Sequence, residues 1–134
     1  MNVFKDLRAL VVDDQSMMAE LLKSILVKLG FVDVAVAESG AEALERLRSE
    51  RFHLVLADLK MEPMSGLRLV QLIRAEAALK GTCVLMATAS RDIASAASAK
   101  HVGVDDYLLK PFTPATLRAR LEKLMPLLRR AEDR

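Results

Sequence analysis

Short apolar segments alternate along this chain with longer segments in which apolar residues recur every three or four positions. A recurrence of apolar residues every three or four positions is typical of helices that bury one face. Each short segment has about the length of one β-strand, and together they cover residues 10–12, 34–37, 54–57, 84–87 and 107–109. Strands and helices that alternate in this way predict a βα repeat, which folds into a parallel sheet covered by helices.

The segments at 10–12, 54–57 and 84–87 consist only of Val, Leu, Ala and Met. Strands of this kind are typical of the centre of a parallel sheet, where helices cover both faces. Right-handed crossovers then predict an α/β fold of the flavodoxin-like type, with a doubly wound five-stranded parallel sheet in the order 2-1-3-4-5 and five helices. Such a sheet places its ligand crevice at the carboxyl ends of strands 1 and 3.

Two of the expected helices have clear start signals. Ser39 followed by Glu42 fits a capping box, and Thr113 followed by Pro114 fits the N-cap and the first helical position. Apolar residues keep helical spacing through residues 117–128. We therefore expect one continuous helix after the last strand.

The composition, with 52% apolar and 28% charged residues, is ordinary for a globular protein. No apolar run approaches the roughly 20 residues that cross a bilayer, and the first residues lack the apolar region of a secretory signal. We therefore expect no membrane insertion and a cytoplasmic location. Residues 1–134 are interpreted as a single domain, because only one helix follows the last strand. We therefore expect neither an output domain nor a DNA-binding domain.

Cysteine and charge exclude further classes of site. Cys83 is the only cysteine, so an internal disulfide and a thiolate metal cage within one chain are both excluded. The net charge of +2 is too small to indicate nucleic-acid binding. Arg129, Arg130 and Arg134 are interpreted as a solvated helix end, with a basic surface for an anionic partner as the alternative.

Polar residues follow four of the five expected strands, at the point where each strand ends. They are Asp13, Asp14, Asp58, Thr88 and Lys110. Any one of them has an ordinary explanation as a turn or capping residue. Because the carboxyl ends of parallel strands meet at one edge of the sheet, we expect all five to converge on one small volume.

Three carboxylates in a small volume repel one another, so a stable site needs raised pKa values or a cation between them. Mg²⁺ suits such a site because it takes oxygen ligands and keeps several waters. Zinc is disfavoured, since the chain has one cysteine and two histidines. The sequence therefore predicts a magnesium site.

The order and spacing of five motifs extend across nearly the whole chain. They are VVDD at 11–14, LVLADLKM at 54–61, Gly66, ATAS at 87–90, and Gly103 with DDYLLKPF at 105–112. With these motifs the chain resembles the receiver domain of bacterial two-component systems, in particular the single-domain chemotaxis type. Each motif alone is weak, but the set is specific. The resemblance implies a phosphorylation-dependent signalling switch that catalyses only its own phosphorylation and dephosphorylation.

The resemblance also assigns roles at the acidic cluster. It implies that Asp58 accepts a phosphoryl group from a histidine kinase or a histidine phosphotransfer protein. Asp14, Asp58 and the main-chain carbonyl of Lys60 would bind Mg²⁺, with Asp13 acting through a water molecule.

Further roles follow for the last two strands. Thr88 and Lys110 would each bind a phosphoryl oxygen, and the peptide bond between Lys110 and Pro111 would be cis. Thr88 and Tyr107 would form the switch. Movement of Thr88 toward the phosphoryl group would let Tyr107 turn inward and change how a downstream effector binds the face made of helix 4, strand 5 and helix 5.

The loop after Asp58 departs from the family pattern. Receiver domains usually have Pro four residues beyond the acceptor, whereas Glu62 fills that position here and Pro63 follows. The number of residues to Gly66 is unchanged. We therefore expect the metal-binding carbonyl of Lys60 to be kept.

Other functions share parts of this pattern. A phosphatase of the haloacid-dehalogenase type also forms an aspartyl phosphate with Mg²⁺, but its two acids are separated by one residue, whereas Asp13 and Asp14 are adjacent. A flavodoxin-like cofactor carrier would need a phosphate-binding loop after the first strand, where this chain has the acidic DDQSMM. Within the receiver interpretation, a terminal effector and a phosphorelay intermediate both stay open.

Overall fold

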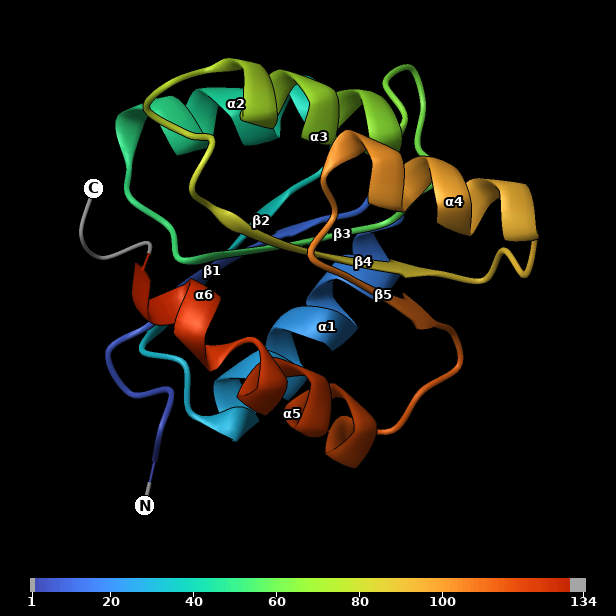
Figure 1. Ribbon diagram of the computed structural model, residues 1–134. Helices are drawn as coiled ribbons and strands as arrows, with labels where there is room; N and C mark the ends of the chain where they lie inside the picture. The colour runs from blue at the N-terminus through green and yellow to red at the C-terminus, as the bar shows by residue number, and fades with distance from the viewer. Residues whose placement is uncertain (1, 131–134) are drawn as a thin grey trace.

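The structure is a computed structural model that describes residues 2–130. Five parallel strands form one sheet with the order β2-β1-β3-β4-β5, as the sequence predicted (Figure 1). The register is continuous, and β1 pairs with β2 on one side and with β3 on the other. The strands are β1 (Arg8–Val12), β2 (Asp33–Ala37), β3 (Leu54–Ala57), β4 (Cys83–Thr88) and β5 (Asp106–Leu109).

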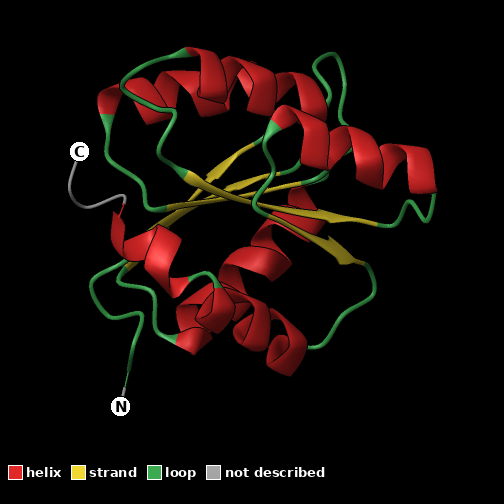
Figure 2. Cartoon of the chain, in the orientation of Figure 1, coloured by secondary structure: helices red, strands yellow, loops and turns green. Residues whose placement is uncertain are grey.

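Helices cover both faces of the sheet (Figures 1 and 2). Three helices lie on one face, and these are α2 (Gly40–Ser49), α3 (Gly66–Ala75) and α4 (Ile93–Val102). The other face carries α1 (Ser16–Leu29), α5 (Pro114–Lys123) and α6 (Met125–Arg130). The predicted doubly wound α/β architecture is therefore confirmed.

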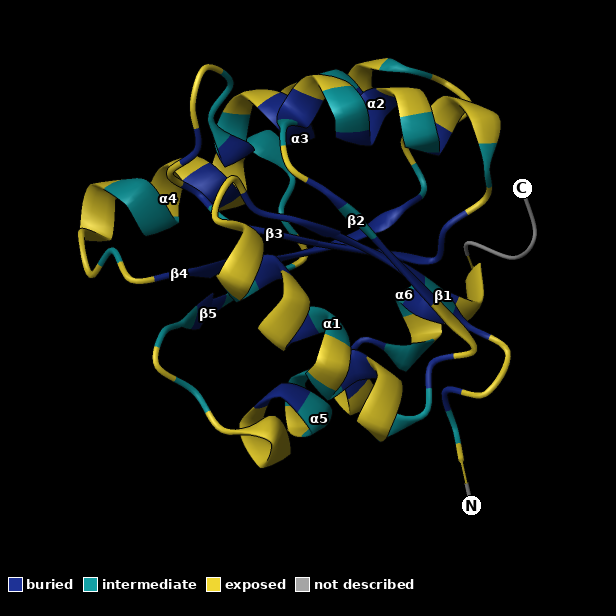
Figure 3. Ribbon diagram, turned by 180° about the vertical axis from the view of Figure 1, so that it is seen from behind, coloured by how far each residue is buried: buried dark blue, intermediate teal, exposed yellow. Residues whose placement is uncertain are grey.

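Two apolar cores lie on opposite faces of the sheet, because successive side chains of a strand point to opposite sides. Ala9 and Val11 of β1 belong to the core beneath α1 and α5, whereas Leu10 and Val12 belong to the core beneath α2 and α3. All four side chains are fully buried. Figure 3 shows the strands almost completely buried, while the helices expose their outer surfaces.

Both predicted helix starts are confirmed. The hydroxyl of Ser39 accepts a hydrogen bond from the N–H of Glu42 at 3.1 Å, and that of Thr113 accepts one from the N–H of Thr116 at 3.1 Å. Each bond satisfies a main-chain donor that has no partner within its own helix.

The prediction of one continuous last helix is wrong, and the described chain has six helices rather than five. The break lies at Leu124, between α5 and α6. Pro126 explains it, because proline has no N–H to donate to the carbonyl of Glu122 and its ring clashes with that carbonyl.

Among the described residues, no helix is both long and apolar enough to cross a membrane.

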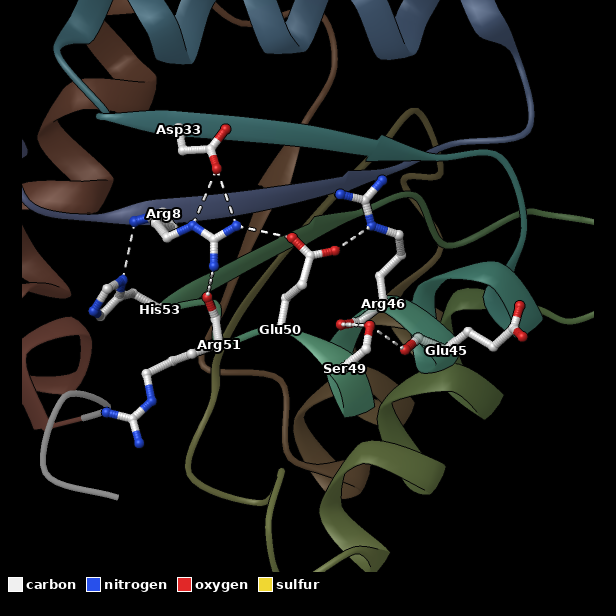
Figure 4. Close-up of polar contacts among 8 residues, drawn as sticks. All are labelled: Arg8, Asp33, Glu45, Arg46, Ser49, Glu50, Arg51 and His53. Carbon is white, nitrogen blue, oxygen red and sulfur yellow. Dashed lines mark hydrogen bonds and ion pairs between the residues drawn. The ribbon is translucent and has the colours of Figure 1, made fainter.

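A polar network fixes the amino ends of β1, β2 and β3, at the edge opposite to the strand ends that carry the candidate site (Figure 4). The guanidinium of Arg8 donates to Asp33 Oδ2 at 3.0 and 3.1 Å, to Glu50 Oε1 at 3.0 Å and to the carbonyl of Arg51 at 2.6 Å. The N–H of Arg8 donates to Nδ1 of His53 at 2.9 Å. His53 and Arg8 therefore serve the framework of the sheet.

Candidate functional site

The main chain of the sheet holds the candidate residues in place just beyond the strand ends. The N–H of Asp13 donates to the carbonyl of Ala37 at 3.1 Å, and the N–H of Asp58 donates to that of Val12 at 3.1 Å. The N–H of Lys110 donates to the carbonyl of Thr88 at 2.8 Å. These residues therefore continue the ladder of the sheet, and their side chains project from a rigid edge.

A single ammonium group lies between two carboxylates at this edge. The Nζ of Lys110 is 3.5 Å from Oδ2 of Asp13 and 3.9 Å from Oδ2 of Asp58. The side chains of Asp13, Lys110 and Asp58 are 1%, 15% and 17% exposed. The site thus opens to solvent at Asp58 and Lys110, while Asp13 forms its floor.

The pKa of Asp58 lies above its ordinary value, and burial of the carboxylate is the main cause. Burial raises the pKa of Asp58, and the charge of Asp13 raises it further. Lys110 and main-chain hydrogen bonds from Lys60 and Leu59 act in the opposite direction, but the pKa remains above its ordinary value. An added cation beside the two carboxylates would stabilise the ionised form of Asp58.

The side chain of Asp14 contacts the loop after β3. It is exposed, and its Oδ2 accepts a hydrogen bond from the main-chain N–H of Glu62 at 3.2 Å. Lys60 is also exposed. Within residues 2–130, no three Asp, Glu, His or Cys side chains come close enough together to hold a metal ion by themselves. The structure therefore joins Asp13, Asp58 and Lys110, and attaches Asp14 to the loop after β3.

Thr88 and Tyr107 both form a hydrogen bond with the main chain of Ser90. The buried hydroxyl of Thr88 accepts a hydrogen bond from the N–H of Ser90 at 3.2 Å. The hydroxyl of Tyr107 donates to the carbonyl of Ser90 at 3.4 Å. Burial raises the pKa of Tyr107, and the charge of Asp92 raises it further. The main chain of Ser90, which the sequence did not single out as a contact, thus links the two expected switch residues.

The loop between β3 and α3 packs tightly against the acceptor. The N–H of Gly66 donates to the carbonyl of Leu59 at 2.8 Å. A Cβ atom at Gly66 would lie only 2.2 Å from the main-chain oxygen of Asp58, so no side chain fits there. The Lys110–Pro111 bond is cis as predicted, and the Glu62–Pro63 bond is cis as well.

Comparison with known proteins identifies the family. Residues 9–122 match the model of the response regulator receiver domain. The chain belongs to this family. Receiver domains are phosphorylation-dependent signalling proteins that act between kinases and effectors, and the strand-end site described above occupies the expected edge of the sheet.

The similar proteins include chemotaxis receiver domains. This receiver domain is 39% identical over 124 residues to the chemotaxis protein CheY-3 of Vibrio cholerae, covering 92% of this chain and 95% of the relative. It is 37% identical over 118 residues to the chemotaxis protein CheY of Pseudomonas aeruginosa, covering 88% and 95%. The solved structure of chemotaxis protein CheY4 of Vibrio cholerae superposes with a TM-score of 0.82 at 31% identity, covering 87% of this chain and 97% of that one.

Receiver domains generally bind Mg²⁺ beside the phosphorylated residue, and the oxygen groups of this receiver domain fit that ion. Asp13 and Asp58 are two carboxylates with a single ammonium, that of Lys110, between them. Mg²⁺ is usually bound by one or two carboxylates and keeps several waters. A site with few protein side chains is therefore compatible with it.

Proposed function

We propose that this receiver domain accepts a phosphoryl group on Asp58 and thereby changes its binding to a downstream effector. The observation that carries the proposal is the placement of the Asp58 carboxylate, partly exposed, beside the Lys110 ammonium and the buried Asp13. A nucleophile that must meet a phosphodonor has to be accessible, and a cation beside it can bind the incoming phosphoryl oxygens.

The chemistry at Asp58 is a simple displacement. A carboxylate oxygen of Asp58 attacks the phosphorus of a phosphohistidine, so that an O–P bond forms while the P–N bond breaks and its electron pair returns to the imidazole. Lys110 stays protonated and binds one phosphoryl oxygen, and the hydroxyl of Thr88 donates to another. The donor is a histidine kinase or a histidine phosphotransfer protein.

Four residues would hold Mg²⁺ at this site. Asp14, Asp58 and the main-chain carbonyl of Lys60 would bind it directly, with Asp13 acting through water. When bound, Mg²⁺ would neutralise charge on the carboxylates and on the transferred group. The role of Asp13 here is also to keep Lys110 in place, because the 3.5 Å ion pair holds the ammonium over the acceptor.

The output face would consist of α4, β5 and α5. Tyr107 is half-buried at a cavity of about 490 Å³ whose walls include Ile93, Phe112 and Thr116. Ile93 is 85% exposed, so this face offers apolar area to a partner. When the Thr88 hydroxyl turns toward a phosphoryl group it releases the N–H of Ser90, and Tyr107, which donates to the same residue, responds.

We further propose that the chain acts as a single receiver domain in the cytoplasm and has no enzymatic turnover beyond its own phosphorylation and dephosphorylation. Incubation with acetyl phosphate and Mg²⁺ should label it with one phosphoryl group per chain, and excess chelator should prevent the labelling. Steady hydrolysis of small phosphate esters without a labelled protein would instead indicate a phosphatase.

A change at Thr88 should separate phosphorylation from switching. Thr88→Ala should still be labelled but should lose the response of Tyr107, because the hydroxyl that senses the phosphoryl group is gone. Tyr107 is the only tyrosine and the chain has no tryptophan, so intrinsic fluorescence reports on this residue alone. Thr88→Ser keeps the hydroxyl and serves as the control. A full phosphorylation-dependent fluorescence change in Thr88→Ala would show that the coupling runs by another route.

A further inference from the structure

A main-chain hydrogen bond connects the two loops that carry the proposed Mg²⁺ ligands. One loop follows β1 and contains Asp14, and the other follows β3 and contains Lys60. The N–H of Glu62 donates to Oδ2 of Asp14 at 3.2 Å. Asp14, Lys60 and Glu62 are all exposed, so their side chains are not held by packing. The hydrogen bond is therefore a specific restraint on a part of the site that is otherwise open to water.

The main-chain N–H of Glu62 can donate this bond because residue 62 is not a proline. Proline has no N–H, and the next residue, Pro63, has none to offer. Receiver domains usually have proline at the position of Glu62, as noted above. This chain therefore has a contact to Asp14 that the usual family sequence cannot make.

We propose that the N–H of Glu62 is a positioning group that pre-organises the Mg²⁺ site. It engages one oxygen of the Asp14 carboxylate, fixes the rotation of that side chain, and leaves the second oxygen for the cation. It also fixes Asp14 relative to the loop whose carbonyl at Lys60 is the other proposed ligand. This inference rests on the proposed function, since it assigns a role to a group beside the proposed ligands.

Two other contacts anchor the loop after β3, so motion of this loop does not remove the restraint on Asp14. The N–H of Gly66 donates to the carbonyl of Leu59 at 2.8 Å, and Met64 packs against Gly40 at the start of α2. The segment between Leu59 and Gly66 is therefore closed at its base, and the bond from Glu62 attaches its tip to Asp14. Groups that orient metal ligands typically change metal affinity by about 10- to 100-fold when they are removed.

Two substitutions at the same position separate the N–H from the side chain. Glu62→Pro removes the N–H, whereas Glu62→Ala removes the carboxylate and keeps the N–H. The dissociation constant for Mg²⁺ is measured by calorimetry on the unphosphorylated protein. We expect Glu62→Pro to weaken binding about 10-fold and Glu62→Ala to stay within about 2-fold of the unchanged chain. Equal binding by Glu62→Pro and the unchanged chain would overturn the inference, as would an equal loss in both variants.

Amide hydrogen exchange tests the bond itself without relying on the proline variant. The N–H of Glu62 should exchange slowly for an exposed loop, and Asp14→Ala should speed its exchange at least about 10-fold, because the acceptor is removed. Unchanged exchange in Asp14→Ala would overturn the inference even if Glu62→Pro fails to fold. Failure of the unchanged chain to bind Mg²⁺ or to be labelled on Asp58 would instead overturn the proposed function.

Discussion

Asp58→Asn should incorporate no phosphoryl group from acetyl phosphate under conditions that label the unchanged chain. The amide that replaces the carboxylate is a poor nucleophile and cannot form the acyl phosphate, so the loss should be complete rather than partial. Labelling is measured with a radioactive donor or by intact mass. The structure of the sheet edge should be kept, because the two side chains have nearly the same shape.

The control for this variant is Asp92→Asn. Asp92 is an exposed acid near the same edge, and its side chain caps α4 by accepting from the N–H of Ala94 at 3.0 Å. Asparagine is an equally good cap, so this variant should fold and be labelled normally. Labelling of Asp58→Asn at the level of Asp92→Asn would exclude Asp58 as the acceptor.

Gly66→Ala should slow phosphorylation about 100-fold while the protein remains folded. The added Cβ would lie 2.2 Å from the main-chain oxygen of Asp58 and 3.0 Å from the Cα of Leu59, both of which are backbone atoms. The chain at the acceptor must therefore shift, and a displacement of about 1 Å at a reacting group can cost about 100-fold in rate. The measurement is the initial rate of labelling, with circular dichroism as the check on folding.

Gly40→Ala is the matched control for this prediction. Its added Cβ would lie 2.4 Å from the sulfur of Met64, which belongs to a flexible side chain that can turn away. The labelling rate should therefore fall much less than in Gly66→Ala. Similar rates in the two alanine variants would mean that the close contact of Gly66 with Asp58 does not position the acceptor.

Much of the fold follows from patterns that depend on neighbouring residues in the sequence. Apolar strand segments gave the five strands, and their composition placed three of them in the middle of the sheet. The convergence of Asp13, Asp58 and Lys110 followed from topology alone, because parallel strands bring their carboxyl ends together. The break before α6 could also have been predicted from the sequence, since Pro126 lies inside the segment that was expected to be one helix.

The contacts that were not foreseen use main-chain groups. The N–H of Glu62 bonds to Asp14, and both main-chain groups of Ser90 connect Thr88 with Tyr107. Nearly every residue has an N–H and a carbonyl, so the sequence gives no signal for which of them will meet a site. For the same reason, Asp14 was expected among the clustered carboxylates, whereas in the structure its side chain accepts from the neighbouring loop.

The identity of the phosphorylated residue decides whether Asp58 is the acceptor. The chain is labelled with acetyl phosphate and Mg²⁺, the acyl phosphate is reduced with borohydride, and the peptides are sequenced by mass spectrometry. Reduction converts a phosphorylated aspartate to homoserine, which marks its position permanently. We expect homoserine at position 58 and nowhere else. Homoserine at position 13 or 14, or a stable phosphate on any other residue, would contradict it.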